Sequence, residues 1–342
     1  MIHVGADLHQ RFCYFTALDA RGRQLRAGAV VNEAEALRQW LRQWLRQLPG
    51  QVQVAVEACS FWPGFREAIE SEVAHLRLVH PQRVKAIAAA KLKNDKVDSA
   101  TLAHLLRCDL LPEAWMADAA TRELRQQVRL RATLVRQRTR LKNQVHAILH
   151  QQGLRSAVSD VFGVRGRQWL TQLKLPTAAR VAVDTYCGLI DHFSQQIATQ
   201  DRALRQQVKR DQRARWLTTI PGIGQFSALL LVAEIGNIER FADKHALCSY
   251  AGLVPWVRES AGHKKARASI TRCGSTWLRW IMVEAACTAV RTSPAARAWF
   301  QRLARRKHKH VARVALARKL LVAVWAMLKH GEVFDEAVFA AM

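Results

Sequence analysis

Four acidic side chains near the start of the chain have the types and spacing of a metal centre. Asp7 and Glu57 each end a run of strand-forming residues. Asp95 and Asp98 are three residues apart at the start of a segment with helical character, so both project from one helical face. Carboxylates gathered in this way repel one another unless cations neutralise them, and a pair of Mg²⁺ ions is the usual solution. We expect these four residues to be catalytic and to bind two Mg²⁺ ions.

Each carboxylate also has a structural interpretation when it is taken alone. Asp98 suits the first turn of a helix, where the helix dipole favours an acid, and Glu57 suits a strand end at the surface. All four together, in one order of strands and helices, are harder to explain structurally, because an acid at the end of an apolar strand is an awkward choice for a core.

A serine in a cation-rich segment is a candidate nucleophile. Ser260 lies in a polar loop with Arg258, Lys264 and Lys265, cations that can hold a phosphate and offset the charge of a pentacovalent transition state. Ser249 is the competing candidate, although it begins an apolar Tyr-Ala-Gly-Leu run that is better suited to packing.

The charge of the chain points to a polyanionic partner. Its 342 residues include 53 Lys and Arg against 27 Asp and Glu, a net charge of +26. Nucleic acid is the first expectation and an anionic membrane the second. The seven cysteines are scattered without C-x-x-C spacing, and the apolar runs are too short to span a bilayer, so we expect a cytoplasmic protein without a disulfide framework or zinc ribbon.

The elements that must position the acids lie in residues 1–112. Strand-forming runs and amphipathic helices predict the order β-β-β-α-β-α-β-α, which is that of an RNase H-like nuclease fold. The predicted strands are Ile2–Leu8, Phe12–Leu18, Gln24–Val31, Val52–Val56 and Leu76–Val79. This order brings Asp7 and Glu57 to neighbouring strand ends of one sheet.

Residues 113–215 predict a coiled-coil or helical linker region. From Ala119 to Gln152 there is no Gly or Pro, and apolar residues from Leu130 to Ile148 recur at steps of three, four and seven. The other faces carry arginines, among them Arg129, Arg136 and Arg140. Because few acids lie at i±4, we expect these cations to contact nucleic-acid phosphate, and a solvated helix surface is the alternative.

Residues 216–342 predict a mainly helical domain that contains Ser260. Ile220-Pro221-Gly222-Ile223-Gly224 before an apolar helix is typical of a helix-hairpin-helix motif. In such a motif Gly222 and Gly224 permit close backbone approach, and the following helix offers free N–H groups to a phosphate. A plain tight turn is the alternative.

Taken in order, these motifs give a resemblance to a known family that covers nearly the whole chain. The chain resembles transposases of the insertion-sequence 110 family in a series of short motifs: Gly5-Ala6-Asp7, Val56-Glu57-Ala58, Asn94–Asp98, Ile220–Gly224, Ser249–Pro255, Ser260-Ala261-Gly262 and Cys273-Gly274. The resemblance implies a RuvC-like domain with a D-E-D-D quartet, matched by Asp7, Glu57, Asp95 and Asp98. It also implies a coiled coil and a C-terminal transposase domain whose serine nucleophile is Ser260. The family's Ser-Gly pair has an extra alanine here.

The resemblance further implies a site-specific recombinase that acts on double-stranded donor and target DNA through a 5′-phosphoserine intermediate. Some members are guided by a bridge RNA, so RNA is an expected partner. Since the quartet and the serine lie in different domains, we expect a homodimer or homotetramer, with the protein associated with the nucleoid when it acts.

Two other functions stay open at this point. A metal-dependent nuclease of Holliday-junction resolvase type needs the same four acids but no serine. A non-catalytic nucleic-acid-binding protein needs neither. A proofreading-type exonuclease is disfavoured, because the position two residues after Asp7 holds His9 and not an acid.

Overall fold

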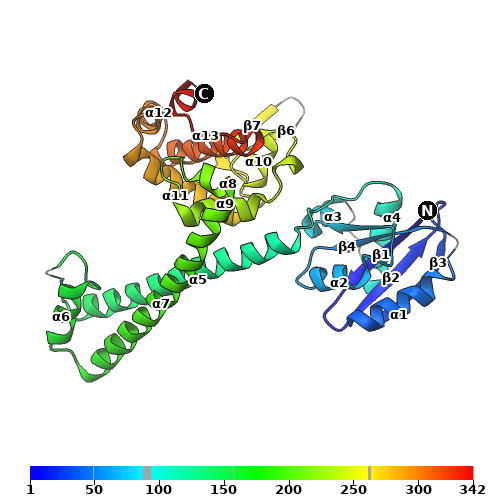
Figure 1. The fold of residues 1–342 in the computed structure, drawn as a ribbon, viewed down its shortest axis with the longest axis horizontal. Helices are drawn as coiled ribbons and strands as arrows, with labels where there is room; N and C mark the ends of the chain where they lie inside the picture. Colours follow the sequence, from blue (N-terminus) through cyan, green and yellow to red (C-terminus); the bar gives the residue numbers. More distant parts are fainter. Residues whose placement is uncertain (49, 88–93, 157, 261–262, 342) are drawn as a thin grey trace. The chain divides into compact units, whose positions relative to one another are not determined.

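The computed structural model describes residues 1–48, 50–87, 94–156, 158–260 and 263–341, with the backbone alone for 257–260 and 263–268 (Figure 1). These residues form two compact units, Met1–Met116 and Ala117–Met342. The division of the second unit at residue 215 stays a prediction. No helix among the described residues is both long and apolar enough to cross a membrane.

The first unit is built on one mixed sheet, as the strand-forming runs predicted. Its strand order is β3-β2-β1-β4-β5, with β1 antiparallel to β2, β2 antiparallel to β3, and β4 parallel to both β1 and β5. The strands are β1 (Ile2–Leu8), β2 (Phe12–Leu18), β3 (Gln24–Val31), β4 (Val52–Glu57) and β5 (His75–Val79). The helices are α1 (Ala34–Leu45), α2 (Trp62–Ile69), α3 (Pro81–Ile87) and α4 (Asp95–Arg107).

Helices cover both faces of this sheet, and alternate strand residues point to each face. On one face, Val4 and Val56 belong to a buried cluster with Leu41 of α1 and Phe65 of α2. On the other, Ala55 packs with Leu102 of α4. Figure 1 shows the helices and the sheet of this unit. Residues of β1 and β4 that alternate with Val4 and Val56 therefore point to the face that α4 covers.

Gly5 of β1 allows α4 to lie directly on the sheet. A Cβ atom at this position would overlap the carbonyl oxygen of Ser99 and lie 2.6 Å from the amide nitrogen of Ala103, both in the backbone of α4. Beside it, the buried hydroxyls of Thr16 and Ser99 form a 2.7 Å hydrogen bond. The distance between β1 and α4 is thus set by a residue without a side chain.

Gly5→Ala is expected to lower the free energy of unfolding by about 3 kcal/mol or more, because α4 must move away from β1. Urea unfolding of the full chain, followed by circular dichroism, measures this. Gly64→Ala in α2 is the control, since a Cβ there meets no atom within 4 Å and alanine favours a helix. Equal unfolding midpoints for the two variants would show that the close packing carries no energetic weight.

The second unit begins with two long helices. The strand-less arm consists of α5 (Ala119–Gln151), α6 (Val164–Gln172) and α7 (Thr177–Arg210), and α5 and α7 lie side by side with α6 at their far end (Figure 1). Val145 and Leu149 of α5 share a buried cluster with Val183 and Ile190 of α7. The predicted apolar seam of α5 is wrong at Leu130, which is 47% exposed. The reason is that the buried face of α5 changes along the helix: Val128 packs in the helical body, whereas Val145 packs against α7.

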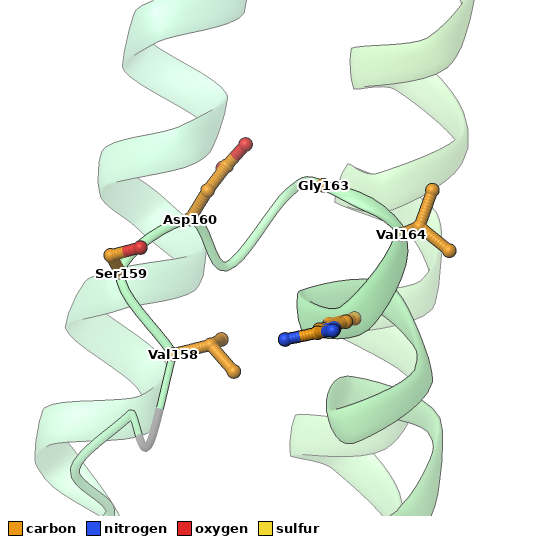
Figure 2. A pocket seen from close by; sticks show the side chains of 6 residues that line it. Val158, Ser159, Asp160, Gly163 and Val164 are labelled. Atoms are coloured by element: carbon orange, nitrogen blue, oxygen red, sulfur yellow. The ribbon is translucent and has the colours of Figure 1, made fainter.

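The loop between α5 and α6 encloses a small hollow (Figure 2). Its volume is about 460 Å³, and its wall includes Ser159, Asp160 and Arg165. Asp160 accepts a 3.0 Å hydrogen bond from the amide of Phe162. The carboxylate therefore stabilises the turn that starts α6.

The rest of the second unit is a helical body with one hairpin of strands. Its helices are α8 (Gln212–Leu217), α9 (Gln225–Ile235), η1 (Ile238–Arg240), α10 (Lys244–Tyr250), α11 (Thr276–Thr292), α12 (Pro294–Ala304), α13 (Lys309–His330) and α14 (Glu336–Ala341). The prediction of a polar loop around Ser260 is wrong, because the segment forms an antiparallel hairpin of β6 (Pro255–Ser260) and β7 (His263–Ile270).

The turn predicted as a helix-hairpin-helix motif joins α8 to α9. Gly222 has a φ of +90°, and a Cβ there would overlap the carbonyl of Ala285 in α11. Gly224 precedes α9 in an open position, and no side chain caps that helix. Gly222 therefore permits close packing against α11. Of the two glycines, Gly224 is the one with free space beside it for a ligand.

Candidate active site

The register of the sheet puts Asp7 and Glu57 at the same edge. Ala6 of β1 pairs with Val56 of the parallel strand β4, so the next residues, Asp7 and Glu57, lie side by side on the two strands. Gly5 and Ala55 face α4, so the residues two positions later point to that side as well. The local alternation of the strands thus aims both carboxylates toward the start of α4.

The start of α4 supplies two more acids. Asn94 caps the helix, and its side-chain oxygen accepts a 2.8 Å hydrogen bond from the amide of Val97. Asp95 and Asp98 occupy the first turn, where the helix dipole favours negative charge. Because α4 lies on β1, this turn meets the end of that strand.

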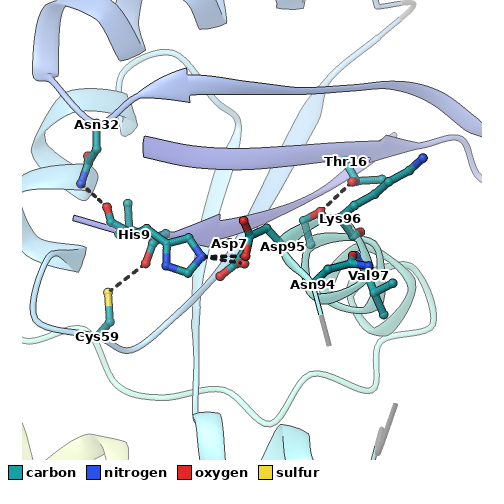
Figure 3. Close-up of polar contacts among 11 residues, drawn as sticks. Asp7, His9, Thr16, Asn32, Cys59, Asn94, Asp95, Lys96 and Val97 are labelled. Carbon is teal, nitrogen blue, oxygen red and sulfur yellow. Dashed lines mark hydrogen bonds and ion pairs between the residues drawn. The ribbon is translucent and has the colours of Figure 1, made fainter. Parts of the chain in front are cut away.

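A histidine that was not among the predicted site residues bridges two of the acids. Nε2 of His9 lies 3.1 Å from Oδ2 of Asp7 and 3.1 Å from Oδ1 of Asp95 (Figure 3). The signal was present in the sequence, since the residue two positions after Asp7 points to the same side of an extended chain. Asn32 donates a 2.8 Å hydrogen bond to the carbonyl of His9 and holds its backbone.

The pKa values of these groups reflect their mutual charges. Burial raises the pKa of Asp7, and the nearby charges of Asp95 and Asp98 raise it further, although His9 opposes both effects. Desolvation lowers the pKa of His9, but the charge and hydrogen bond of Asp7, together with Asp95, outweigh it and leave the value raised. A cation between the carboxylates is thus favourable, and it is either the proton on His9 or a metal ion that replaces that proton on the imidazole.

The donor set fits a divalent metal ion. One ligand atom each from Asp7, His9 and Asp95 lie within 4.8 Å of one another. Neighbouring ligands of an octahedral ion with bonds of about 2.1 Å are about 3.0 Å apart, close to the 3.1 Å separations of His9 from both carboxylates. Glu57 reaches the same edge by register and Asp98 by the helical turn. The described residues therefore support divalent-metal binding here.

The predicted nucleic-acid contacts on α5 occupy different environments. Arg129 forms a 2.7 Å ion pair with Glu234 of α9, and Arg136 lies over the ring of Trp277, 4.3 Å from its centroid. The scarcity of acids at i±4 does not leave Arg129 without a partner, because Glu234 is 105 residues away in sequence. Arg140 is exposed and remains the clearest candidate of the three for phosphate.

The predicted serine lies in the hairpin. Ser260 ends β6 and pairs with His263, while Arg258 pairs with Lys265 and Glu259 with Lys264. Ala261 and Gly262, the rest of the serine motif, lie outside the described residues. Ser249 is exposed in α10, so both candidate serines remain.

Glu234 joins three elements around one buried carboxylate. It is 1% exposed, and it accepts hydrogen bonds from Arg129 of α5 and from the Ser275 hydroxyl at the start of α11. Arg125 donates to the carbonyls of Ala233 and Glu234. Two of the arginines of α5 therefore bind the helical body.

Arg129→Ala is expected to lower the free energy of unfolding by about 2–3 kcal/mol, because it leaves the buried Glu234 carboxylate without its cation. Arg140→Ala, on an exposed position of the same helix, should change it by no more than about 0.5 kcal/mol. Chemical unfolding of both variants gives the comparison. If Arg129→Ala were as stable as Arg140→Ala, the ion pair would not hold α5 to the body.

Comparison with known proteins identifies the class of enzyme. A transposase family model for the DEDD domain of IS110 elements matches residues 4–153. The model described as Transposase IS116/IS110/IS902 family matches residues 214–301, so the two matches together span more than half of the chain. The protein is thus a DNA transposase. It belongs to the IS110 family of insertion-sequence transposases.

Individual relatives agree with this assignment. A probable family 20 transposase of Pseudomonas aeruginosa is 28% identical over 80% of this chain and 83% of its own length. The transposase for insertion sequence element IS1111A of Coxiella burnetii is 25% identical over 82% and 79%. The transposase for insertion sequence element IS1328 of Yersinia enterocolitica is 28% identical over 83% and 85%.

Proposed function

We propose that the protein is a site-specific DNA recombinase that cleaves and rejoins strands through a covalent serine–DNA intermediate. The observation that carries the proposal is the meeting of Asp7, His9 and Asp95 at the start of α4. This arrangement, at the edge of a mixed sheet with β1 in its centre, is what a RuvC-like nuclease domain needs. The metal, in the proposal a pair of Mg²⁺ ions, supplies Lewis-acid activation of the scissile phosphate.

The residues of the chain divide the remaining work. Asp7, Glu57, Asp95 and Asp98 hold the cations, and their spacing orients the phosphodiester. The Oγ of Ser260 attacks phosphorus and loses its proton, while the P–O3′ bond breaks and the released 3′ oxygen takes up a proton. Attack by the 3′-hydroxyl of a partner strand then breaks the P–Oγ bond and restores the serine. Energy is conserved in the phosphoserine bond, so no ATP is needed.

The partners in the proposal are double-stranded donor and target DNA and a bridge RNA that pairs with both. Arg140, the backbone at Gly224, and the hairpin residues Arg258, Lys264 and Lys265 are the proposed phosphate contacts. Because the acids and the serine belong to different units, the proposal includes a homodimer or homotetramer. Coiled-coil pairing through the α5–α7 arm and a helix-hairpin-helix contact to DNA are parts of the same proposal.

Glu57→Gln and Asp98→Asn should each abolish DNA cleavage and weaken Mn²⁺ binding about tenfold or more, since each removes a negatively charged ligand. Calorimetric titration with Mn²⁺ and a supercoiled-plasmid nicking assay are the two measurements. Glu70→Gln is the control, because Glu70 pairs with Arg66 on the surface of the same unit. Normal cleavage by both site variants would remove these acids from the site.

Ser260→Ala should bind DNA and metal but give no protein–DNA adduct that survives denaturation, because it lacks the attacking oxygen. Gel electrophoresis of denatured reactions on a nicked, labelled duplex detects the adduct. Ser249→Ala is the matched variant and should form it normally. An adduct lost with Ser249→Ala and kept with Ser260→Ala would reverse the assignment, and cleavage without any adduct would favour a resolvase-like nuclease that uses water.

A further inference from the structure

A buried lysine in α13 has no hydrogen-bond partner in the described part of the chain. Lys319 is 8% exposed, and its Nζ makes no hydrogen bond to any described residue. Lysine is rarely buried without a partner, because its three N–H donors and its charge lose water. Burial lowers the pKa of Lys319, and the positive charge of Arg302 lowers it further. The proposed active site does not include Lys319, so its burial has a separate cause.

Two aromatic rings hold the ammonium group. Nζ lies 5.3 Å from the ring centroid of Trp299 in α12 and 4.7 Å from that of Phe339 in α14. Cation–π attraction of this kind is worth about 0.5–2 kcal/mol and uses none of the N–H donors for a hydrogen bond. The rings therefore stabilise the buried ammonium group without satisfying its N–H donors.

The same lysine lines a cavity between α10, α12 and α13. The cavity has a volume of about 480 Å³, within the range of sites for small ligands. Trp299, Leu303, Ala315 and Val322 form its apolar wall, and Lys244, Arg318 and Lys319 add positive charge. None of the described residues that line it is acidic. An anion that also carries a flat apolar group would match this wall.

We propose that this cavity binds one unpaired nucleotide of a nucleic-acid strand, with its base on Trp299 and its phosphate near Lys244, Arg318 and Lys319. Base stacking on an aromatic side chain together with cations for the backbone is the usual basis of single-strand binding. Lys319 already lines the cavity, so in the proposal a rotation of its terminal torsions turns its N–H groups toward the phosphate. The inference uses only the action of the protein on DNA, and neither the metal site nor Ser260.

The test measures binding of short, fluorescein-labelled oligothymidylate and oligouridylate to the full chain, in EDTA, over a series of salt concentrations. Lys319→Met keeps the length of the side chain and removes the charge. It should weaken binding about tenfold and reduce the log–log salt slope by about 0.7, the value for one phosphate on a single strand. Its melting temperature should not fall, since replacing a buried charge by an apolar residue is often neutral or stabilising.

Lys309→Met, at an exposed position on the same helix, is the matched control and should bind nearly as the wild type does. Trp299→Leu should also weaken binding about tenfold by loss of stacking. Photocrosslinking of a 5-iodouracil-containing strand should place the adduct on the peptide that contains Trp299, a result that does not depend on variants. Comparison of the two oligonucleotides shows whether the nucleotide comes from DNA or RNA.

The proposal is overturned if Lys319→Met binds like Lys309→Met, or if the crosslink maps away from α12 and α13. It is overturned equally if the wild-type chain binds neither oligonucleotide. If the substitutions weaken binding of a duplex as much as binding of a single strand, the site is a phosphate contact only, and the proposal is refuted. Because EDTA is present throughout, none of these results depends on the proposed catalytic mechanism.

Discussion

The direct contact of α4 with β1 at Gly5 determines where the acidic side chains meet. The backbone of α4 at Ser99 and Ala103 occupies the space that any Cβ at position 5 would need. Asp7 is two residues further along the same strand face, and Asp95 begins the same helix. The 3.1 Å distances from His9 to both carboxylates therefore depend on a residue that takes no part in the chemistry. A larger residue at position 5 would separate the strand end from the helix start.

In the second unit a single buried carboxylate has the corresponding role. Glu234 accepts hydrogen bonds from Arg129 and Ser275, so α5, α9 and α11 meet at one charge. An ion pair with one buried partner is held more firmly than a surface pair, because removing the cation leaves an uncompensated charge. Arg131 is similarly engaged with Asp201 of α7. The count of 53 Lys and Arg therefore overstates how many cations are free to meet an external anion.

The sequence predicted those features that depend on neighbours along the chain. The bounds of β1, β2 and β3 follow from strand-forming runs separated by turns. The approach of Asp95 to Asp7 instead depends on how α4 packs on β1, which neighbours along the chain do not determine. The partner of Arg129 was not predictable, because a search at i±4 does not reach a residue on another helix. The β6–β7 hairpin was not predicted, since the lysines of its strands have weak strand propensity and pairing between the strands overrides that propensity.

The cationic side chains of this chain attract DNA and the acidic ones repel it, so the residues that bind DNA differ from those proposed to act on it. A phosphodiester is itself an anion, so its approach to Asp7, Asp95 and Asp98 is unfavourable until cations neutralise them. His9 offsets only part of that charge, since one imidazole faces two carboxylates directly. Affinity must then come from cationic side chains elsewhere, whereas the acids contribute only when a metal ion lies between them and the phosphate. In the proposed mechanism, the transposase therefore holds DNA by its cationic residues and cuts it only where cations neutralise the acids.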